Sequence, residues 1–249
     1  MDLLLGTVAL RPYVFAFLAV FVAAGVVDLG WRRTLGFTAC LWPVALAAEL
    51  SSTRTGFPFG LYRYTGLTRG QELFIADVPF IDSLSFVFLA YAAYCLARAA
   101  LARRAVPRWA MALAAGVLMM GLDVVIDPLA VRGDRWFLGP LFTYEEPGVY
   151  FGVPLSNFAG WVIVGAVGVG LFLSLGKDDS LGKDDSGRRI WPGVALYYAV
   201  LGFNLTMTVQ IGELLLAVIG ATIHLGVALS VWSIHRKPGV EVRSQSRGI

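Results

Sequence analysis

Seven stretches of mostly apolar residues, separated by segments that are polar or rich in Gly and Pro, set the pattern of this sequence. They cover residues 12–27, 34–50, 78–96, 109–126, 153–175, 191–209 and 214–234. A helix needs about 20 apolar residues to cross the hydrocarbon core of a bilayer, and each stretch is close to that length. The pattern predicts an all-α polytopic membrane helix bundle with about seven transmembrane helices, in a single domain over residues 12–234.

Composition agrees with a lipid environment. The chain has 249 residues, of which 57% are hydrophobic and 15% charged, and its mean hydropathy is +0.71. Soluble domains have roughly 45–50% apolar and about 25% charged residues, so a soluble globular protein is excluded. The first stretch lacks a basic leader and a small-residue cleavage site, and we therefore expect a retained helix rather than a signal peptide.

Basic residues alternate between the segments that join the stretches. Fourteen of the 20 lie at 32–33, 98–108, 177–189 and 236–247. Because cytoplasmic loops are enriched in Lys and Arg, these segments mark the inner side. We predict a multi-pass protein of the cell membrane with its N-terminal segment, 1–11, outside and its cytoplasmic tail, 235–249, inside. Eleven of the 17 acids fall on the outer side, so the net charge of +3 hides a polarised molecule and gives no reason to expect nucleic acid as a partner.

The connecting segments differ in character. Two outer loops, about 51–77 and 127–152, are dense in aromatic residues, Gly and Pro, and we expect them to fold back over the helices. The inner linker, 176–190, carries most of a direct repeat of LGKDDS that begins at 175 and again at 181. Small charged residues are typical of a solvated linker, which is a poor scaffold for a magnesium and diphosphate clamp.

Carboxylates near the outer helix ends are the main candidates for chemistry. Placing one carboxylate in mid-membrane costs about 2.5–3.5 kcal/mol, so each such residue is expected to have a functional or structural role. Asp123 and Asp127 are four residues apart, share one helix face and should face the same neighbour. Two such groups repel when both are ionised, and we expect one to keep its proton at neutral pH. A structural alternative stays open, in which Asp127 caps the helix end before Pro128 and Asp123 bonds a neighbouring helix.

Further polar residues lie at the same depth. Glu49 ends the second stretch, where it can serve the site or pair with Arg54 at the interface. Asp82 lies near the start of the third stretch and deeper than Asp77. We expect Asp77 only to interact with the positive N-terminal end of that helix. Asn157 enters the membrane with the fifth stretch, and its amide needs partners in hydrocarbon, such as a water or a carboxyl group.

Several cofactor classes are disfavoured. Two histidines are too few for a di-iron site or a paired-histidine haem, and His224 is expected to pack within the seventh stretch. All three lysines lie outside the spans, so no retinal Schiff base can form in the bundle. The two cysteines have no metal or disulfide spacing, and no phosphate loop or zinc-protease motif occurs. We expect neither a metal nor a cofactor.

Three segments carry a resemblance to a known family. They are Glu49 with FPFGLYRY at 57–64, DVVIDP at 123–128, and above all YFGVPLSNFAGW at 150–161. The chain from the second to the seventh stretch resembles the membrane carotenoid 1,2-hydratase family, of the bisanhydrobacterioruberin and γ-carotene hydratase type. The resemblance implies cofactor-independent addition of water to the terminal 1,2 double bond of an acyclic (ψ) carotenoid, giving a tertiary 1-hydroxy carotenoid. The implied partners are a lycopene-, γ-carotene- or bisanhydrobacterioruberin-like substrate, water and the bilayer, with other carotenoid-pathway enzymes as candidates.

The chemistry of such a reaction assigns roles to the candidates. Protonation of the less substituted carbon leaves a tertiary cation, which water captures. We expect the deeper Asp123 to donate the proton, and Asp127, Glu49 or Asp82 to stabilise the cation and orient the water. Aromatic and amide side chains would bind the end group, with rings facing the cation: Tyr62, Tyr64, Phe151, Asn157, Phe158 and Trp161.

Two other functions remain open from the sequence. Carotenoid end-group cyclisation begins with the same protonation, but an internal double bond captures the cation; polar Ser156 and Asn157 favour water. A proton-coupled transporter would use the outer carboxylates to bind protons or cations, although the sequence offers no inverted-repeat signature for it.

Overall fold

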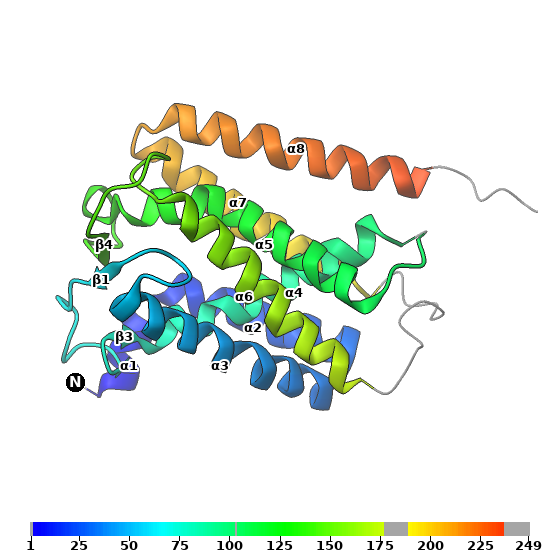
Figure 1. The fold of residues 1–249 in the computed structure, drawn as a ribbon, viewed down its shortest axis with the longest axis horizontal. Helices are drawn as coiled ribbons and strands as arrows, with labels where there is room; N and C mark the ends of the chain where they lie inside the picture. Colours follow the sequence, from blue (N-terminus) through cyan, green and yellow to red (C-terminus); the bar gives the residue numbers. More distant parts are fainter. Residues whose placement is uncertain (1, 103, 177–188, 237–249) are drawn as a thin grey trace, which may run out of the picture.

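The structure, a computed structural model, describes residues 2–102, 104–176 and 189–236 (Figure 1). Those residues form a helix bundle with the elements α1 (Leu3–Leu10), α2 (Pro12–Leu29), α3 (Trp31–Thr55), β1 (Tyr62–Tyr64), β2 (Phe74–Ile75), β3 (Val78–Pro79), α4 (Phe80–Ala100), α5 (Arg108–Ala130), the 3₁₀ turn η1 (Gly133–Arg135), β4 (Phe142–Tyr144), α6 (Leu155–Leu175), α7 (Trp191–Gln210) and α8 (Leu214–Arg236). In the described chain, seven helices, α2 to α8, are long and apolar enough to cross a membrane. The seven predicted spans are thus confirmed, and the 1–11 segment adds the short helix α1.

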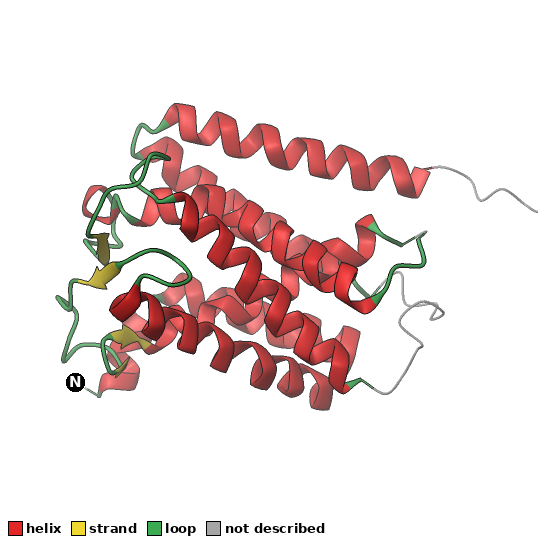
Figure 2. Ribbon diagram, viewed as in Figure 1, coloured by secondary structure: helices red, strands yellow, loops and turns green. Residues whose placement is uncertain are grey.

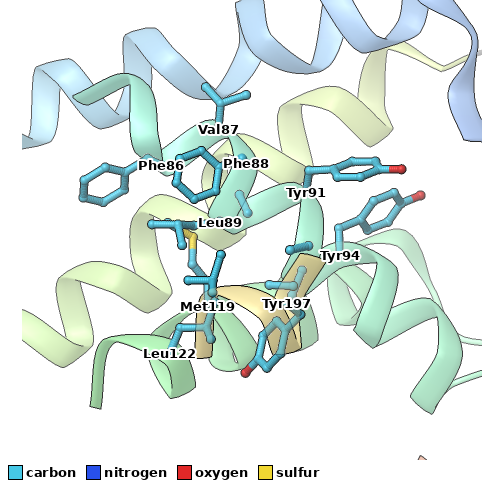
Figure 3. Packing of buried hydrophobic residues seen from close by; sticks show 14 of the residues in the cluster. Phe86, Val87, Phe88, Leu89, Tyr91, Tyr94, Met119, Leu122 and Tyr197 are labelled. Atoms are coloured by element: carbon cyan, nitrogen blue, oxygen red, sulfur yellow. The ribbon is translucent and has the colours of Figure 1, made fainter. Parts of the chain in front are cut away.

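The long helices run roughly side by side, and the strands and the N-terminus gather at one end of the bundle, here called the strand-bearing end (Figures 1 and 2). Helix α4 forms the centre, with every residue from 86 to 97 buried and contacts to α2, α3, α5 and α7. A helix that is apolar on all sides is expected to be enclosed by its neighbours. Figure 3 shows Phe86, Leu89 and Tyr94 of α4 in the same cluster as Met119 and Tyr197.

Glycines allow α6 to approach its neighbours closely. A Cβ atom at Gly116 of α5 would lie 2.5 Å from the carbonyl oxygen of Val162, and one at Gly165 of α6 would lie 2.8 Å from the Cα of Gly116. A Cβ at Gly168 would overlap Leu41 of α3. Small residues at these positions are the usual means of close helix packing in membranes. The α5–α6 seam is therefore closed by contact between backbones, and the α3–α6 seam by the side chain of Leu41 against Gly168.

The fourth span ends later than the sequence predicted. The outer loop was expected to begin at 127, but α5 continues through Asp127 and Pro128 to Ala130. Proline removes one helical donor and so leaves the carbonyl four residues earlier without its bond. The hydroxyl of Tyr150 donates to that carbonyl, of Val124, at 3.3 Å, so the helix tolerates the proline. Asp127 is thus held on a helix. Likewise, α3 extends to Thr55 before Gly56, which adopts the left-handed conformation with φ 81°.

The two loops that were predicted to lie outside meet over the end of the bundle. Strands β1 and β4 pair antiparallel, with Tyr62 opposite Tyr144 and Tyr64 opposite Phe142. The expectation that these loops fold back is therefore confirmed for this pair of segments (Figure 2). Most of the LGKDDS repeat and nearly all of the predicted cytoplasmic tail lie outside the described residues.

Candidate active site

A cavity of about 140 Å³ lies beneath the β1–β4 pair at the strand-bearing end. Its walls come from α2 to α7 and from the loops that follow α3 and α5. Three carboxyl groups on three helices line it: Glu49 of α3, Asp82 of α4 and Asp127 of α5. The other walls are mostly apolar or aromatic, so the cavity combines several acids with a hydrocarbon-like interior.

Asp123 and Asp127 share one partner across the α5–α6 interface. The side-chain amide of Asn157 donates to Asp123 Oδ2 at 2.6 Å and to Asp127 Oδ2 at 2.8 Å. The indole of Trp161 also donates to Asp127 Oδ2, at 3.3 Å. The four-residue spacing on α5 and on α6 brings each pair onto one helix face, so both acids face the same neighbour, as predicted.

Only one acid of this pair borders the cavity. Asp123 is fully buried, whereas Asp127 lines the cavity wall. Within the described residues, no basic side chain forms an ion pair with either acid. Because two adjacent carboxylates repel strongly in a low-dielectric site, we infer that the pair carries one proton. A proton held here can reach the cavity only through Asp127.

Glu49 forms a second acidic group on the cavity wall. The hydroxyl of Tyr64 donates to Glu49 Oε1 at 2.8 Å, while the buried Oε2 has no hydrogen-bond partner. The pairing of Glu49 with Arg54, left open from the sequence, is not found: Arg54 pairs with Asp77 at 2.9 Å. Burial, and then the adjacent Glu49, raise the pKa of Tyr64 well above its usual value, so its hydroxyl remains a donor.

Asp82 belongs to a buried network that the sequence did not reveal. Arg11 contacts Glu72 at 3.2 Å and Asp82 at 3.3 Å, and both the arginine and Glu72 are almost fully enclosed. One cation between two carboxylates leaves a net negative charge beside the cavity. A buried arginine requires an acidic partner, so Arg11 itself was a signal that such a network could exist. Spacing along the chain could not identify Glu72 and Asp82 as the partners, because they lie 61 and 71 positions away.

Aromatic side chains close the cavity from the loop side. Tyr62, Tyr64, Phe142 and Tyr144 pack edge to face, with ring centroids 5.5–6.2 Å apart. Tyr144 was not predicted; burial, and then the carboxyl group of Asp127, raise its pKa. On the opposite wall Trp161 stacks on Phe86, with centroids 4.7 Å apart. The rings give the cavity that holds the acids a largely apolar wall.

Two predicted substrate-binding residues lie elsewhere. Phe151 and Phe158 do not line the cavity; their rings pack on Tyr150, with centroids 4.9 Å and 5.3 Å away. The other four, Tyr62, Tyr64, Asn157 and Trp161, do line it. His224 is buried and contacts Tyr197 and the Gly220 carbonyl, in keeping with a packing role.

Comparison with known proteins identifies the family to which this chain belongs. Residues 3–229 match the family described as "Carotenoid biosynthesis protein". The chain is 33% identical over 213 residues to bisanhydrobacterioruberin hydratase of Haloarcula japonica, an alignment that covers 79% of this chain and 69% of that protein. No solved structure matches the chain significantly. The match over almost the whole described bundle shows that this chain belongs to the carotenoid biosynthesis protein family.

Proposed function

We propose that this protein is a carotenoid hydratase, which adds water to the terminal 1,2 double bond of an acyclic carotenoid end group. The observation that carries the proposal is the carboxyl pair Asp123–Asp127, which is held by one amide and of which Asp127 lines a cavity with aromatic walls. The hydratase named among its relatives supports the same reaction class. The charge pattern of the sequence supports a position of this cavity on the outer side of the cell membrane.

The reaction begins with transfer of the shared proton from Asp127 to the less substituted carbon of the double bond. The deeper Asp123 was the expected donor, but Asp127 is the acid that borders the cavity, so we assign the transfer to Asp127. Asp123 acts behind it, as the carboxyl group with which the proton is shared. Asn157 and Trp161 fix the orientation of Asp127 through the bonds to its Oδ2.

Proton transfer leaves a tertiary cation at the neighbouring carbon. The face of Trp161 and the ring of Tyr62 border the cavity and can stabilise this charge with their π electrons. The carboxyl group of Asp82 lies on the same cavity wall, 3.3 Å from Arg11, and its oxygen atoms can stabilise the positive charge. Stabilisation by fixed groups needs no rearrangement at the moment of reaction.

Water then forms the new C–O bond, and its surplus proton must leave. Glu49 Oε2 and Asp82 Oδ2 are both buried acceptors without a partner on the cavity wall. Because Asp82 already contacts Arg11, we assign Glu49 to hold the water and accept that proton. The hydrogen bond from Tyr64 fixes the other oxygen of Glu49. The product gains one hydrogen on carbon and one hydroxyl group, and the proton taken up by Glu49 returns to the Asp123–Asp127 pair by exchange through water before the next turnover.

Product analysis tests this proposal. The gene is expressed in a host that accumulates lycopene, and the pigments are separated and weighed by mass spectrometry. A hydratase yields a carotenoid heavier by one water for each end group hydrated. A cyclic end group at unchanged mass identifies a cyclase and refutes the proposal. Unchanged pigments together with proton-coupled flux in proteoliposomes identify a transporter.

A further inference from the structure

The size of the cavity raises the question of where the rest of a carotenoid lies. Pockets that enclose a complete drug-sized ligand measure about 300–1,000 Å³, whereas this cavity measures about 140 Å³. It can therefore hold one end group and its water, while the polyene passes through a wall. Because a polyene is apolar, that wall must open towards lipid between two helices.

Three other helix seams of the bundle are closely packed at contacts beyond the cavity. The α5–α6 and α3–α6 seams are closed by the glycine contacts described above. At the α4–α7 seam, a Cβ atom at Gly193 would overlap the Sγ of Cys95. Opening any of these seams must first break this packing, which densely packed interiors resist.

The α2–α7 seam is built differently. Tyr13 of α2 stacks on Phe203 of α7, with ring centroids 4.9 Å apart, and Phe17 meets the same ring at 5.8 Å. All three rings line the cavity and are only partly buried. Across the part of the chain that the structure describes, no hydrogen bond or ion pair joins α2 to α7. Rotation of side chains alone can therefore open this seam.

The chemistry of the seam also suits a polyene. The acids of the cavity lie on α3, α4 and α5, while α2 and α7 present Val14, Phe17, Val200 and Phe203, with Asn204 as the polar residue of α7 on the wall. Trp136 and Phe137 pack against Phe203 from the segment after α5, with centroids 6.5 Å and 6.4 Å away. Aromatic faces stack favourably on conjugated chains.

We propose that the polyene chain of the substrate leaves the cavity between α2 and α7, through an opening closed by Tyr13, Phe17 and Phe203. This inference rests on the proposed function in taking a carotenoid as the ligand. It deepens that function by giving the position of the polyene: the end group lies at Asp127, and the chain passes the three rings into the bilayer.

Photo-crosslinking tests the opening without requiring turnover. A phenylalanine analogue carrying a diazirine replaces Phe203, in the wild-type and the Asp127→Asn backgrounds, and the protein is irradiated in nanodiscs that contain lycopene. The carbene formed by loss of N₂ inserts into a bond of a neighbouring molecule. The matched control places the same analogue at Leu229 of α8, which is 54% exposed and does not line the cavity. A probe at Tyr13 repeats the test if the variant at 203 does not fold.

The expected result is a mass increase of one lycopene on the probe at 203 or 13, and none at 229. Equal labelling at 203 and 229 overturns the proposal, because it reports only carotenoid dissolved in lipid. Absence of an adduct at both 203 and 13 also overturns it, even if hydration is normal. An adduct at 203 in a protein that does not hydrate lycopene supports the opening while refuting the proposed function, so the two failures are distinguishable.

Discussion

Replacing Asp127 with asparagine removes the acid proton that the proposed reaction needs, while it keeps the size and shape of the side chain. In the structure, Asp127 Oδ2 accepts bonds from Asn157 and Trp161, and the amide oxygen of an asparagine can still accept them. The variant is therefore expected to fold with the cavity intact. What it loses is the ability to donate a proton to carbon.

The size of this loss follows from the role assigned to Asp127. A positioned general acid contributes about 10²–10⁴-fold to a rate, which corresponds to about 3–5 kcal/mol in the activation barrier. Asp123→Asn should cost less, about tenfold, because Asp123 does not border the cavity and loses roughly the value of one hydrogen bond to a charged group. The predicted order of activity is wild type, Asp123→Asn, then Asp127→Asn.

The assay measures initial rates of hydroxylated product from lycopene with equal amounts of purified protein. Asp77→Asn is the matched control, because Asp77 forms an exposed pair with Arg54, their side chains being 36% and 53% exposed. Exposed pairs contribute about 0–1 kcal/mol, so the control should behave like wild type. Full activity of Asp127→Asn, or a larger loss in Asp123→Asn, refutes the assignment of the donor.

Three further variants test separate parts of the site and fold. Tyr64→Phe removes the 2.8 Å bond to Glu49 and should slow hydration by about tenfold, the value of one hydrogen bond; an unchanged rate would argue against Glu49 as the water-holding acid. Arg11→Gln leaves two buried carboxylates without their cation and should destabilise the protein by about 3–5 kcal/mol, measured by thermal unfolding in detergent; an unchanged melting temperature would contradict the network. The hydrogen bond from Arg135 lowers the pKa of Glu213 in the folded protein. The ionised Glu213 therefore stabilises the fold above the unfolded-state pKa, and this stabilisation is lost as the pH falls through the lower folded-state pKa. Glu213→Gln should therefore reduce the stability lost on acidification, and an identical acid profile would exclude this contribution.

The spans and the acid pair were predictable because each depends on local spacing. A helix that crosses lipid must satisfy its backbone internally and show apolar side chains over about 20 residues, and this pattern is visible in the sequence alone. Asp123 and Asp127 fall on one face by helical geometry. Asn157 was recognisable as a partner because an amide in hydrocarbon needs one, and the structure places it against both acids.

Other features depend on how distant segments meet, which spacing does not specify. The Arg11–Glu72 contact joins residues 61 positions apart. Phe151 and Phe158 belong to the same motif as Asn157 and Trp161, but they pack on Tyr150 instead of lining the cavity. The end of α5 was misjudged because Pro128 normally signals a helix end, whereas the hydroxyl of Tyr150 satisfies the carbonyl that the proline leaves free.

The reaction of the purified protein with lycopene in deuterium oxide tests the central claim most directly. If Asp127 protonates the end group and water captures the cation, the product gains one hydroxyl group and one non-exchangeable deuterium on the adjacent carbon for each end hydrated, and Asp127→Asn forms neither. A hydroxylated product without deuterium on that carbon would contradict acid-driven hydration, and deuterium without a hydroxyl group would show that water does not capture the cation.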